Sequence, residues 1–325
     1  MKKNEILVIY GTQYKEITKC LLKEADLAAH IPSKESKIGI KPNLVSPSEA
    51  SYGATTHPEV VAGIIEYLQE YGFYNVIMME GSWVGDKTKN AVSVCGFDKI
   101  SEKYGVPFFD MQTEKSSLYD CAGMELNLCN LAKEVDFLIN VPVMKGHCQT
   151  KITCALKNMK GLIPNSEKRR FHALGLHKPI AHLNAGIRQD FIVIDNICGD
   201  WDFEDGKLGI GCSDWRQAQI RELNVPKQQD TLPKARKIVE LRDAVEEVES
   251  CSACYGYLIP ALQQLKEEGL LEKIGTKICI GQGYREKEGE LGIGSCTRKF
   301  QYHLDGCPPT ENQIYEFLKK YIMQK

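Results

Sequence analysis

The sequence has neither a long hydrophobic run nor an excess of charge of one sign. No stretch approaches the roughly 18 consecutive apolar residues that mark a membrane-spanning helix. The 325-residue chain balances 41 Lys and Arg against 43 Asp and Glu, for a formal net charge of -2, and no basic or acidic tail stands out. A nucleic-acid-binding protein usually carries a basic surface. The sequence therefore predicts a protein with no membrane span and no nucleic-acid partner.

The N-terminus also lacks the features of a secretory signal. It starts with basic residues, but the apolar run that follows is too short, and no small-residue cleavage site comes after it. We therefore expect a cytoplasmic protein. The apolar fraction of 43% suffices for a sizeable core, and the length predicts two domains or one large α/β domain.

Short apolar runs alternate with amphipathic segments through the first 200 residues. Apolar residues at helical spacing mark residues 15–31 and 57–72, and a short helix is expected from about Thr150 to Met159. Strands that alternate with helices are typical of βαβ units, so we predict an α/β fold with a mainly parallel sheet and flanking helices. The predicted strands are residues 5–11, 36–45, 74–82, 106–111, 135–144 and 190–197.

A polar, turn-rich stretch after residue 200 divides the chain. We expect an α/β domain over residues 1–200, an irregular connection over 201–233 and a C-terminal, cysteine-bearing α/β part over 234–325.

The C-terminal part has its own helix and strand patterns. Helices are predicted at residues 233–249 and 251–269, the second interrupted near Pro260, and a strand is predicted at 277–283. The residues from Thr310 to Gln313 have the pattern of a capping box, which predicts the start of the last helix.

Thirteen cysteines are many for a cytoplasmic chain, and the odd number argues against a fully paired disulfide framework. In a reducing compartment cysteines act as core residues, nucleophiles or metal ligands. Seven of them lie among apolar neighbours and are predicted to be small buried hydrophobes. These are Cys20, Cys95, Cys121, Cys129, Cys154, Cys198 and Cys279.

Four other cysteines have the pattern of a metal centre. Cys251 and Cys254 form a C-x-x-C pair, and Cys296 and Cys307 each follow a Gly-containing turn, the second directly before two prolines. Four thiolates fit a [4Fe–4S] cluster or a tetrahedral zinc site. Because the second pair is split and followed by prolines, we favour the cluster. Zinc, a redox dithiol at Cys251 and Cys254, and unrelated buried thiols are the alternatives.

A second candidate site follows the predicted strands. Ligands of open parallel sheets bind beyond the carboxyl ends of the strands, and a helix N-terminus there would add free N–H groups. The side chains at this edge suit a small anion such as a carboxylate or a phosphate. The alternative is a set of solvated lysines and a capping histidine. The candidates are Lys145, His147, Lys157 and Asn158, with Lys41 and Asn43 as further binding residues.

Two more residues lie at the same predicted edge. His57 starts the helix after the second strand, and Asp195 ends a buried strand. Either position suits a proton-transfer group or a partner that orients one.

These motifs together resemble the domain-of-unknown-function 362 family, which is often described as iron–sulfur or ferredoxin-like. The resemblance rests on "IKPNLV", "NVPVMKGHCQTKITCALKNMKGLIP" and "FIVIDNICGDWDFEDG", and the cysteine-bearing tail marks a subgroup. The "GCPPT" turn is also similar to a cluster turn in small subunits of complex I and nickel–iron hydrogenases. Relatives usually carry a further strand and helix after the aspartate-rich strand. In this chain, residues 203–224 connect the two sides of that segment directly, so a strand and a helix of the common core are missing. This difference puts the catalytic activity of the chain in question.

We therefore expect an iron–sulfur protein whose [4Fe–4S] cluster exchanges electrons with a ferredoxin-like donor. It would serve as an oxidoreductase on a small anionic substrate, with Lys145 and Lys157 binding the anion and His147 transferring a proton. One rival is a non-redox carboxylate-binding protein or isomerase with a structural metal site. Another is an electron-carrying or scaffold module without a substrate of its own.

Overall fold

The computed structural model describes residues 5–147, 150–199, 219–224, 241, 244–248, 250 and 252–324. The chain forms two compact units. We call the first the N-terminal unit; it contains the described residues up to 145, from 153 to 199 and from 219 to 224. The C-terminal unit contains the described residues from 241 onward together with the short segment at 146–152. The expected connection over 201–233 lies almost entirely outside the described residues.

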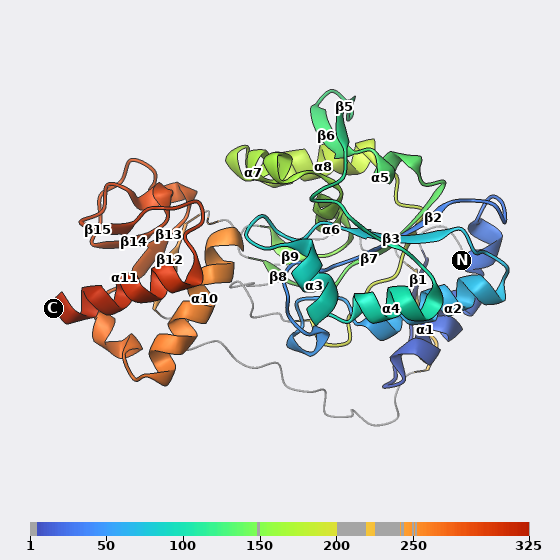
Figure 1. Ribbon diagram of the computed structural model, residues 1–325, viewed down its shortest axis with the longest axis horizontal. Coiled ribbons are helices and arrows are strands. Elements are labelled where there is room, and N and C mark those ends of the chain that lie inside the picture. Colours follow the sequence, from blue (N-terminus) through green and yellow to red (C-terminus); the bar gives the residue numbers. More distant parts are fainter. Residues whose placement is uncertain are drawn as a thin grey trace. The chain divides into compact units, whose positions relative to one another are not determined.

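A five-stranded parallel sheet forms the centre of the N-terminal unit (Figure 1). This confirms the prediction of an α/β fold with a mainly parallel sheet. The chain builds the sheet outward from β2 in one direction and then returns to place β7 on the other side of β2. The order therefore reverses between β2 and β7. In spatial order the strands are β10 (Phe191–Ile192), β7 (Phe137–Val141), β2 (Ile38–Pro42), β3 (Val76–Glu80) and β4 (Phe108–Asp110).

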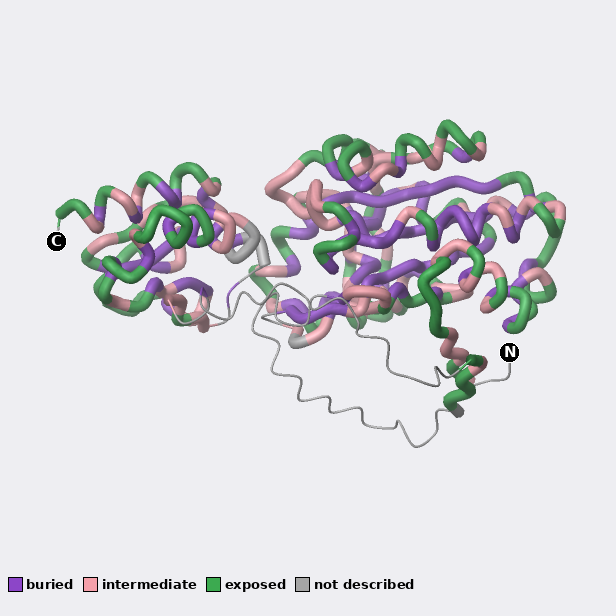
Figure 2. Tube along the Cα trace, turned by 90° about the horizontal axis from the view of Figure 1, so that it is seen from below, coloured by how far each residue is buried: buried purple, intermediate pink, exposed green. Residues whose placement is uncertain are grey.

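The central strands are buried along their whole length, as Figure 2 shows. Alternate side chains of β3 enter different cores, because successive residues of a strand point to opposite faces. Val76 and Met78 belong to one core, and Ile77 and Met79 belong to the other. Continuous apolar runs are expected for parallel strands covered on both faces.

Helices cover each face of this sheet (Figure 1). One group packs on the core that contains Met78 and Ile139. It comprises α1 (Tyr14–Glu24), η1 (Leu27–His30), α2 (Pro58–Glu70), α3 (Thr88–Val94) and α4 (Phe97–Tyr104), while η2 (Ala50–Tyr52) lies between β2 and α2 in the chain.

The second group packs on the core that contains Met79 and Leu138. It includes an antiparallel hairpin of two strands besides its helices. Its elements are β5 (Ser116–Asp120), β6 (Glu125–Cys129), α5 (Leu131–Glu134), α6 (Ala155–Asn158), η3 (Met159–Leu162), α7 (Asn165–Ala173) and α8 (His177–Gly186).

The segment after β7 corrects one prediction. The helix expected from Thr150 begins only at Ala155, because the residues before it form β9 (Lys151–Thr153), which pairs with β8 (Lys145–His147). β-Branched Ile152 and Thr153 favour an extended backbone, and this pairing outweighs the four apolar residues at helical spacing. β1 (Glu5–Val8) forms as predicted but pairs with β11 (Gln219–Glu222) in a separate two-stranded sheet.

The C-terminal unit is a smaller α/β layer. Its four strands run parallel and lie in sequence order. Buried residues of α10, including Leu258 and Leu262, share one core with Ile280 and Ile293 of the sheet. The elements are β12 (Val245–Glu247), α10 (Ser252–Glu267), η5 (Leu271–Ile274), β13 (Ile278–Ile280), η6 (Gln282–Tyr284), β14 (Leu291–Ile293), η7 (Ser295–Thr297), β15 (Tyr302–Leu304) and α11 (Glu311–Gln324).

Two helix predictions for this unit need correction, and one helix start is confirmed. α10 continues through Pro260, because packing of its buried face outweighs the missing N–H. The helix expected to extend to residue 249 does not do so, since Val245–Glu247 form a strand that pairs with β13. At α11 the Thr310 amide donates to Gln313 Oε1 at 2.9 Å and the Gln313 amide donates to Thr310 Oγ1 at 3.4 Å, which confirms the capping box.

Candidate functional site

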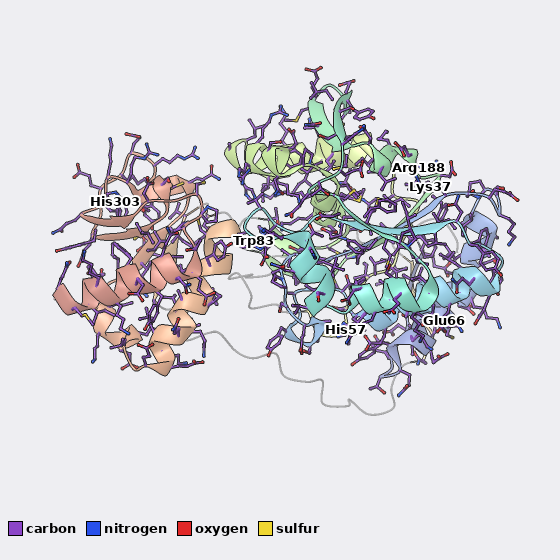
Figure 3. All side chains as sticks on the ribbon, in the orientation of Figure 1. Lys37, His57, Glu66, Trp83, Arg188 and His303 are labelled. Carbon is purple, nitrogen blue, oxygen red and sulfur yellow. The ribbon has the colours of Figure 1, made fainter. Side chains whose placement is uncertain are left out.

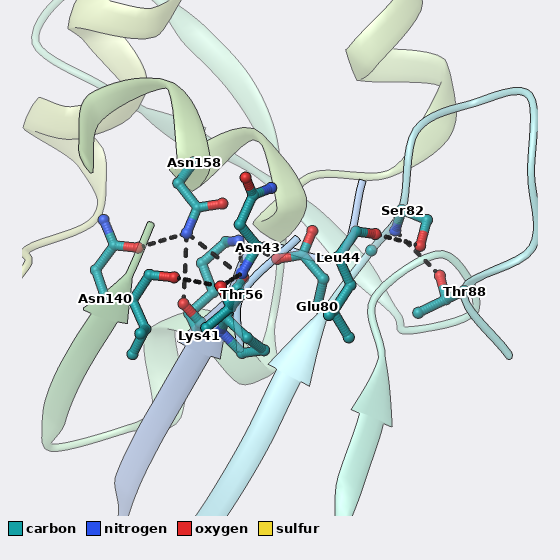
Figure 4. Close-up of polar contacts among 12 residues, drawn as sticks. Lys41, Asn43, Leu44, Thr56, Glu80, Ser82, Thr88, Asn140 and Asn158 are labelled. Carbon is teal, nitrogen blue, oxygen red and sulfur yellow. Dashed lines mark hydrogen bonds and ion pairs between the residues drawn. The ribbon is translucent and has the colours of Figure 1, made fainter. Parts of the chain in front are cut away.

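A buried ion pair lies where β2 and β3 end. Lys41 Nζ contacts Glu80 Oε2 and also donates to the Pro42 carbonyl at 3.0 Å (Figure 4). Lys41 is fully buried and Glu80 is 3% exposed. Loss of hydration lowers the pKa of Lys41 and raises the pKa of Glu80, while the attraction between the two charges opposes both shifts. A pair of this kind costs desolvation energy and is not expected in an ordinary apolar core.

A second lysine approaches the same carboxylate from α7. Lys168 Nζ donates to the carbonyl oxygens of Gly81 at 2.9 Å and Ser82 at 2.7 Å. Burial lowers the pKa of Lys168 to about 8, and the nearby charge of Glu80 opposes that shift. Gly161 makes room for the carboxylate, since a Cβ there would lie 2.2 Å from Glu80 Oε1.

Three asparagines line the point where the strand order reverses. Asn158 Nδ2 donates to Asn140 Oδ1 at 2.7 Å and lies 3.4 Å from the carbonyl oxygens of Lys41 and Pro42 (Figure 4). The Oδ1 atoms of Asn43 and Asn158 are buried and have no hydrogen-bond partner among the described residues. Buried polar atoms usually bind protein groups, water or a ligand. The switch point of an open parallel sheet is also where ligands commonly bind.

The other predicted residues of this site lie in the segment after β7. Lys145 is buried, and its Nζ donates to the Ala54 carbonyl at 2.5 Å. His147 is also buried, and its Nδ1 accepts from the Thr150 amide at 3.1 Å. Lys157 is half-buried on α6. The structure therefore brings Lys41, Asn43 and Asn158 together, while the hydrogen bond of Lys145 Nζ joins it to the segment before α2.

Sequence reasoning missed Glu80 and Lys168. Glu80 is the single charged residue of its buried strand, which is a usable signal for a functional position. Lys168 stands in a polar helix among other charged residues, and nothing in that pattern distinguishes it from a solvated lysine.

His57 and Asp195 meet at the same edge of the sheet. The amide of His57 donates to Asp195 Oδ2 at 2.8 Å, and His57 Nδ1 lies 2.9 Å from the same oxygen. Burial lowers the pKa of His57, but hydrogen bonds to Asp195 and Cys198 outweigh it and raise the pKa to about 10. Figure 3 labels His57 at the helical layer on one side of the sheet.

A second candidate site lies at one end of the C-terminal sheet. Cys254 is buried, and its Sγ lies 3.5 Å from the position that a Cβ on Gly294 would occupy. The Gly294 amide donates to the Leu304 carbonyl at 2.8 Å, and the Ser295 amide donates to the Gly306 carbonyl at 2.9 Å. These bonds hold the turn before Cys296 against the turn before Cys307.

The three described cysteines therefore share one edge. Cys254 is buried, Cys296 is half-buried and Cys307 is exposed, while Cys251 lies outside the described residues. They follow the carboxyl ends of β12, β14 and β15 respectively. Gly294 has a φ of 94°, a left-handed conformation that favours glycine and leaves the space beside Cys254 open. Thiol donors and an open glycine turn fit a cluster or a metal ion.

The described residues lack two features. No three His, Cys, Asp or Glu side chains within them stand close enough to hold a single metal ion. Within the same residues, no helix combines the length and the apolar character that crossing a bilayer requires.

Two known proteins resemble parts of this chain. A thylakoid-associated protein of Synechocystis sp. is 25% identical over 136 residues, and the match covers 42% of each chain. A crystal structure of a Thermotoga maritima protein shares 12% identity at a TM-score of 0.36 and covers 55% of this chain and 50% of its own. At that TM-score the likeness bears on neither fold nor function.

A family match includes the polar edge of the N-terminal unit. The match to the family described as "Domain of unknown function (DUF362)" covers residues 38–213. This range begins with β2 and contains the Lys41–Glu80 pair, the three asparagines and the His57–Asp195 pair. Because the match covers more than half of the sequence, the chain belongs to the DUF362 family.

Proposed function

We propose that this protein is an iron–sulfur protein whose C-terminal unit holds one [4Fe–4S] cluster through Cys251, Cys254, Cys296 and Cys307. The observation that carries the proposal is that the three described cysteines follow the carboxyl ends of parallel strands, with the turns before Cys296 and Cys307 hydrogen-bonded to each other. Cys251 precedes Cys254 by three residues in the sequence and completes the proposed set of four thiol ligands.

The surroundings of the cysteines suit anionic sulfur ligands. Cys254 lies in the first turn of α10, where backbone N–H groups and the helix dipole favour a thiolate. Gly294 places no side chain beside Cys254, and the absence of a side chain at Gly306 makes room for Pro309 in the turn after Cys307. When bound, a [4Fe–4S] cluster supplies one-electron transfer. The residues of this unit would fix its position and adjust the charge that surrounds it.

In this proposal the N-terminal unit binds a small polar anion at its switch point. Lys41, Asn43 and Asn158 form the buried part of that site, and the open hydrogen-bonding capacity of both amides is the supporting observation. Lys145 and Lys157 of the same unit would bind the anion. The protein would be a cytoplasmic oxidoreductase that receives electrons from a ferredoxin-like donor.

One observation favours a non-redox alternative. Glu80 is a buried carboxyl with a raised pKa between two lysines, an arrangement that can move a proton without any redox cofactor. In that case the protein would bind or isomerise a carboxylate, and the cysteines would hold a structural zinc ion or cluster.

The first experiment is purification without oxygen, followed by measurement of iron, acid-labile sulfide, zinc and the EPR spectrum after reduction. We expect about four irons and four sulfides per chain, with a [4Fe–4S] signal. The Cys307→Ser variant should lose most of the iron. The control is Cys279→Ser, since Cys279 is a half-buried thiol on β13 of the same unit and should not affect iron content.

The outcomes separate the two functions. A colourless protein that holds one zinc ion, or one that takes up no iron during reconstitution, would contradict the cluster proposal and leave the carboxylate alternative. Equal iron loss in Cys307→Ser and Cys279→Ser would show that the assigned ligand set is wrong.

A further inference from the structure

A further cysteine, Cys198, has polar neighbours in the N-terminal unit. The four predicted cluster ligands belong to the C-terminal part of the chain. Cys198 Sγ lies 3.7 Å from His57 Nε2, while His57 Nδ1 lies 2.9 Å from Asp195 Oδ2. The three side chains therefore form a row of thiol, imidazole and carboxylate. The apolar neighbours of Cys198 in the sequence predict a core residue, but its side chain is half-buried beside the ionisable ring of His57.

Several contacts fix this row. The Asp195 amide donates to the Pro142 carbonyl at 2.9 Å, and the Ile197 amide donates to Asp195 Oδ1 at 3.2 Å. The ring of Tyr14 packs edge-on against the ring of His57, with 5.1 Å between centroids. Because one carboxylate oxygen binds both the amide and Nδ1 of His57, Nδ1 must carry a proton, and Nε2 faces the sulfur.

The sulfur has two neighbours that define where its proton can lie. The Ala50 carbonyl lies 3.1 Å from Sγ and accepts a hydrogen bond from a neutral thiol. His57 Nε2 offers the other position. Asp195 stabilises the imidazolium that results, in the way that the third member of a nucleophile–base–carboxylate row does.

We propose that Cys198, His57 and Asp195 form a nucleophilic thiol site that accepts an activated acyl group. None of the four proposed cluster ligands belongs to this site. Its residues come from the start of α2 and from the segment after β10, which both lie at the carboxyl edge of the central sheet.

Transfer of the acyl group to Cys198 and its hydrolysis need no oxidant or reductant. His57 Nε2 takes the proton of the thiol, and the sulfur lone pair forms a bond to the acyl carbon. The bond from that carbon to the leaving oxygen or sulfur then breaks, and the leaving group takes the proton from His57. Water, activated by the same imidazole, then hydrolyses the thioester and restores the thiol.

The test uses the full chain and two probes, iodoacetamide and p-nitrophenyl acetate, with peptide mass spectrometry to resolve the individual cysteines. At about pH 6.5 we expect Cys198 to be alkylated roughly tenfold faster than the exposed Cys20, since an adjacent imidazolium favours the thiolate. With p-nitrophenyl acetate, the acetyl group should appear on Cys198 and p-nitrophenolate should be released. In His57→Gln both reactions at Cys198 should fall about tenfold or more.

Cys95 is the matched control within the same chain. Its Sγ also lies 3.1 Å from a carbonyl oxygen, that of Ser48, but the neighbouring side chain is Thr55 instead of an imidazole. Its reactivity should not respond to His57→Gln.

Two results would overturn the proposal. One is alkylation of Cys198 at about pH 6.5 that is no faster than that of Cys20. The other is an unchanged rate in a folded His57→Gln variant. If that variant does not fold, the wild-type pH profile decides: a rate at Cys198 that rises with pH in parallel with Cys20 contradicts the proposal, and a rate already near its maximum below pH 7 supports it.

Discussion

The two units place their polar groups at the same kind of position, the carboxyl ends of parallel strands, but use different chemistry there. The N-terminal edge buries charges and amides whose hydrogen bonds are mostly made within the protein, as for Lys41 and Glu80. The C-terminal edge gathers thiols on glycine turns, and a thiol forms only weak hydrogen bonds. The first edge thus makes its polar contacts within the fold, whereas the second, in the proposed function, would form its strongest interactions with a bound cluster.

Among the variants that test this comparison, the one that removes a buried charge should have the largest effect on stability. In Lys41→Met, Glu80 would lose its closest partner while it stays buried, which should lower the free energy of unfolding by about 3–5 kcal/mol. Denaturant unfolding of the variant measures this loss. In the double variant Lys41→Met/Glu80→Gln the loss should be smaller than the sum of the two single losses. A single-variant loss below about 1 kcal/mol would show that the pair is not structurally important.

The next largest effect is the pH dependence of the stability that His57 contributes. The pKa of His57 is raised from 6.5 to about 10 in the folded chain, so its charged form stabilises the fold fully below pH 6.5 and loses that effect as the pH rises towards 10. The stability of the wild type relative to His57→Gln should therefore decrease over this window, by on the order of a few kcal/mol. Denaturant unfolding of both proteins across the window measures the change. A difference that is independent of pH would contradict the assigned ion pair with Asp195.

A glycine substitution tests the thiol edge. Gly294→Ala places a Cβ in a left-handed backbone and 3.5 Å from Cys254 Sγ, so it should cost about 1–2 kcal/mol of stability and reduce iron retention. Gly269→Ala is the matched control, because it has a positive φ as well but open space around its Cα. Both variants should lose similar stability in chemical unfolding, whereas only Gly294→Ala should lose iron. Equal iron content would separate this turn from the cluster.

The smallest expected effect concerns the helix that follows the cysteine turn. Thr310→Ala removes one side of the capping box of α11 and should cost about 1 kcal/mol. Thermal unfolding measures the loss. Thr113→Ala, an exposed threonine outside this helix, provides the comparison and should cost less. If the two variants unfold alike, the capping box contributes little to this unit.

The fold was predictable where the signal was local and repeated. The parallel sheet followed from alternating apolar runs and helices, and the start of α11 followed from four residues. β9 was missed because Ile152 and Met159 happen to fit helical spacing, while its pairing with β8 depends on residues on the other side of a turn. α10 runs through Pro260 because of packing that no local pattern reveals.

The candidate sites also differed in how far the sequence could predict them. Cysteine is a rare residue whose spacing is informative, so the candidate ligands could be chosen from the sequence. Glu80 and Lys168 are common residue types whose importance comes from burial next to Lys41, and that proximity arises only when the strands align. Cys198 was assigned to the core because its neighbours in sequence are apolar, although its neighbour in space is His57.

Gly161 shows how such a distant contact can leave a mark in the sequence. Its backbone is not in the left-handed region, so its lack of a side chain serves the carboxylate of Glu80 and not a tight turn. Across relatives, positions 80 and 161 should therefore vary together: a chain that loses the acid is free to acquire a side chain at 161. Gly161, which ends the stretch "KNMKG" that begins with Lys157 and Asn158, would then indicate a buried acid on a neighbouring strand. Its loss would identify relatives that no longer have this part of the site.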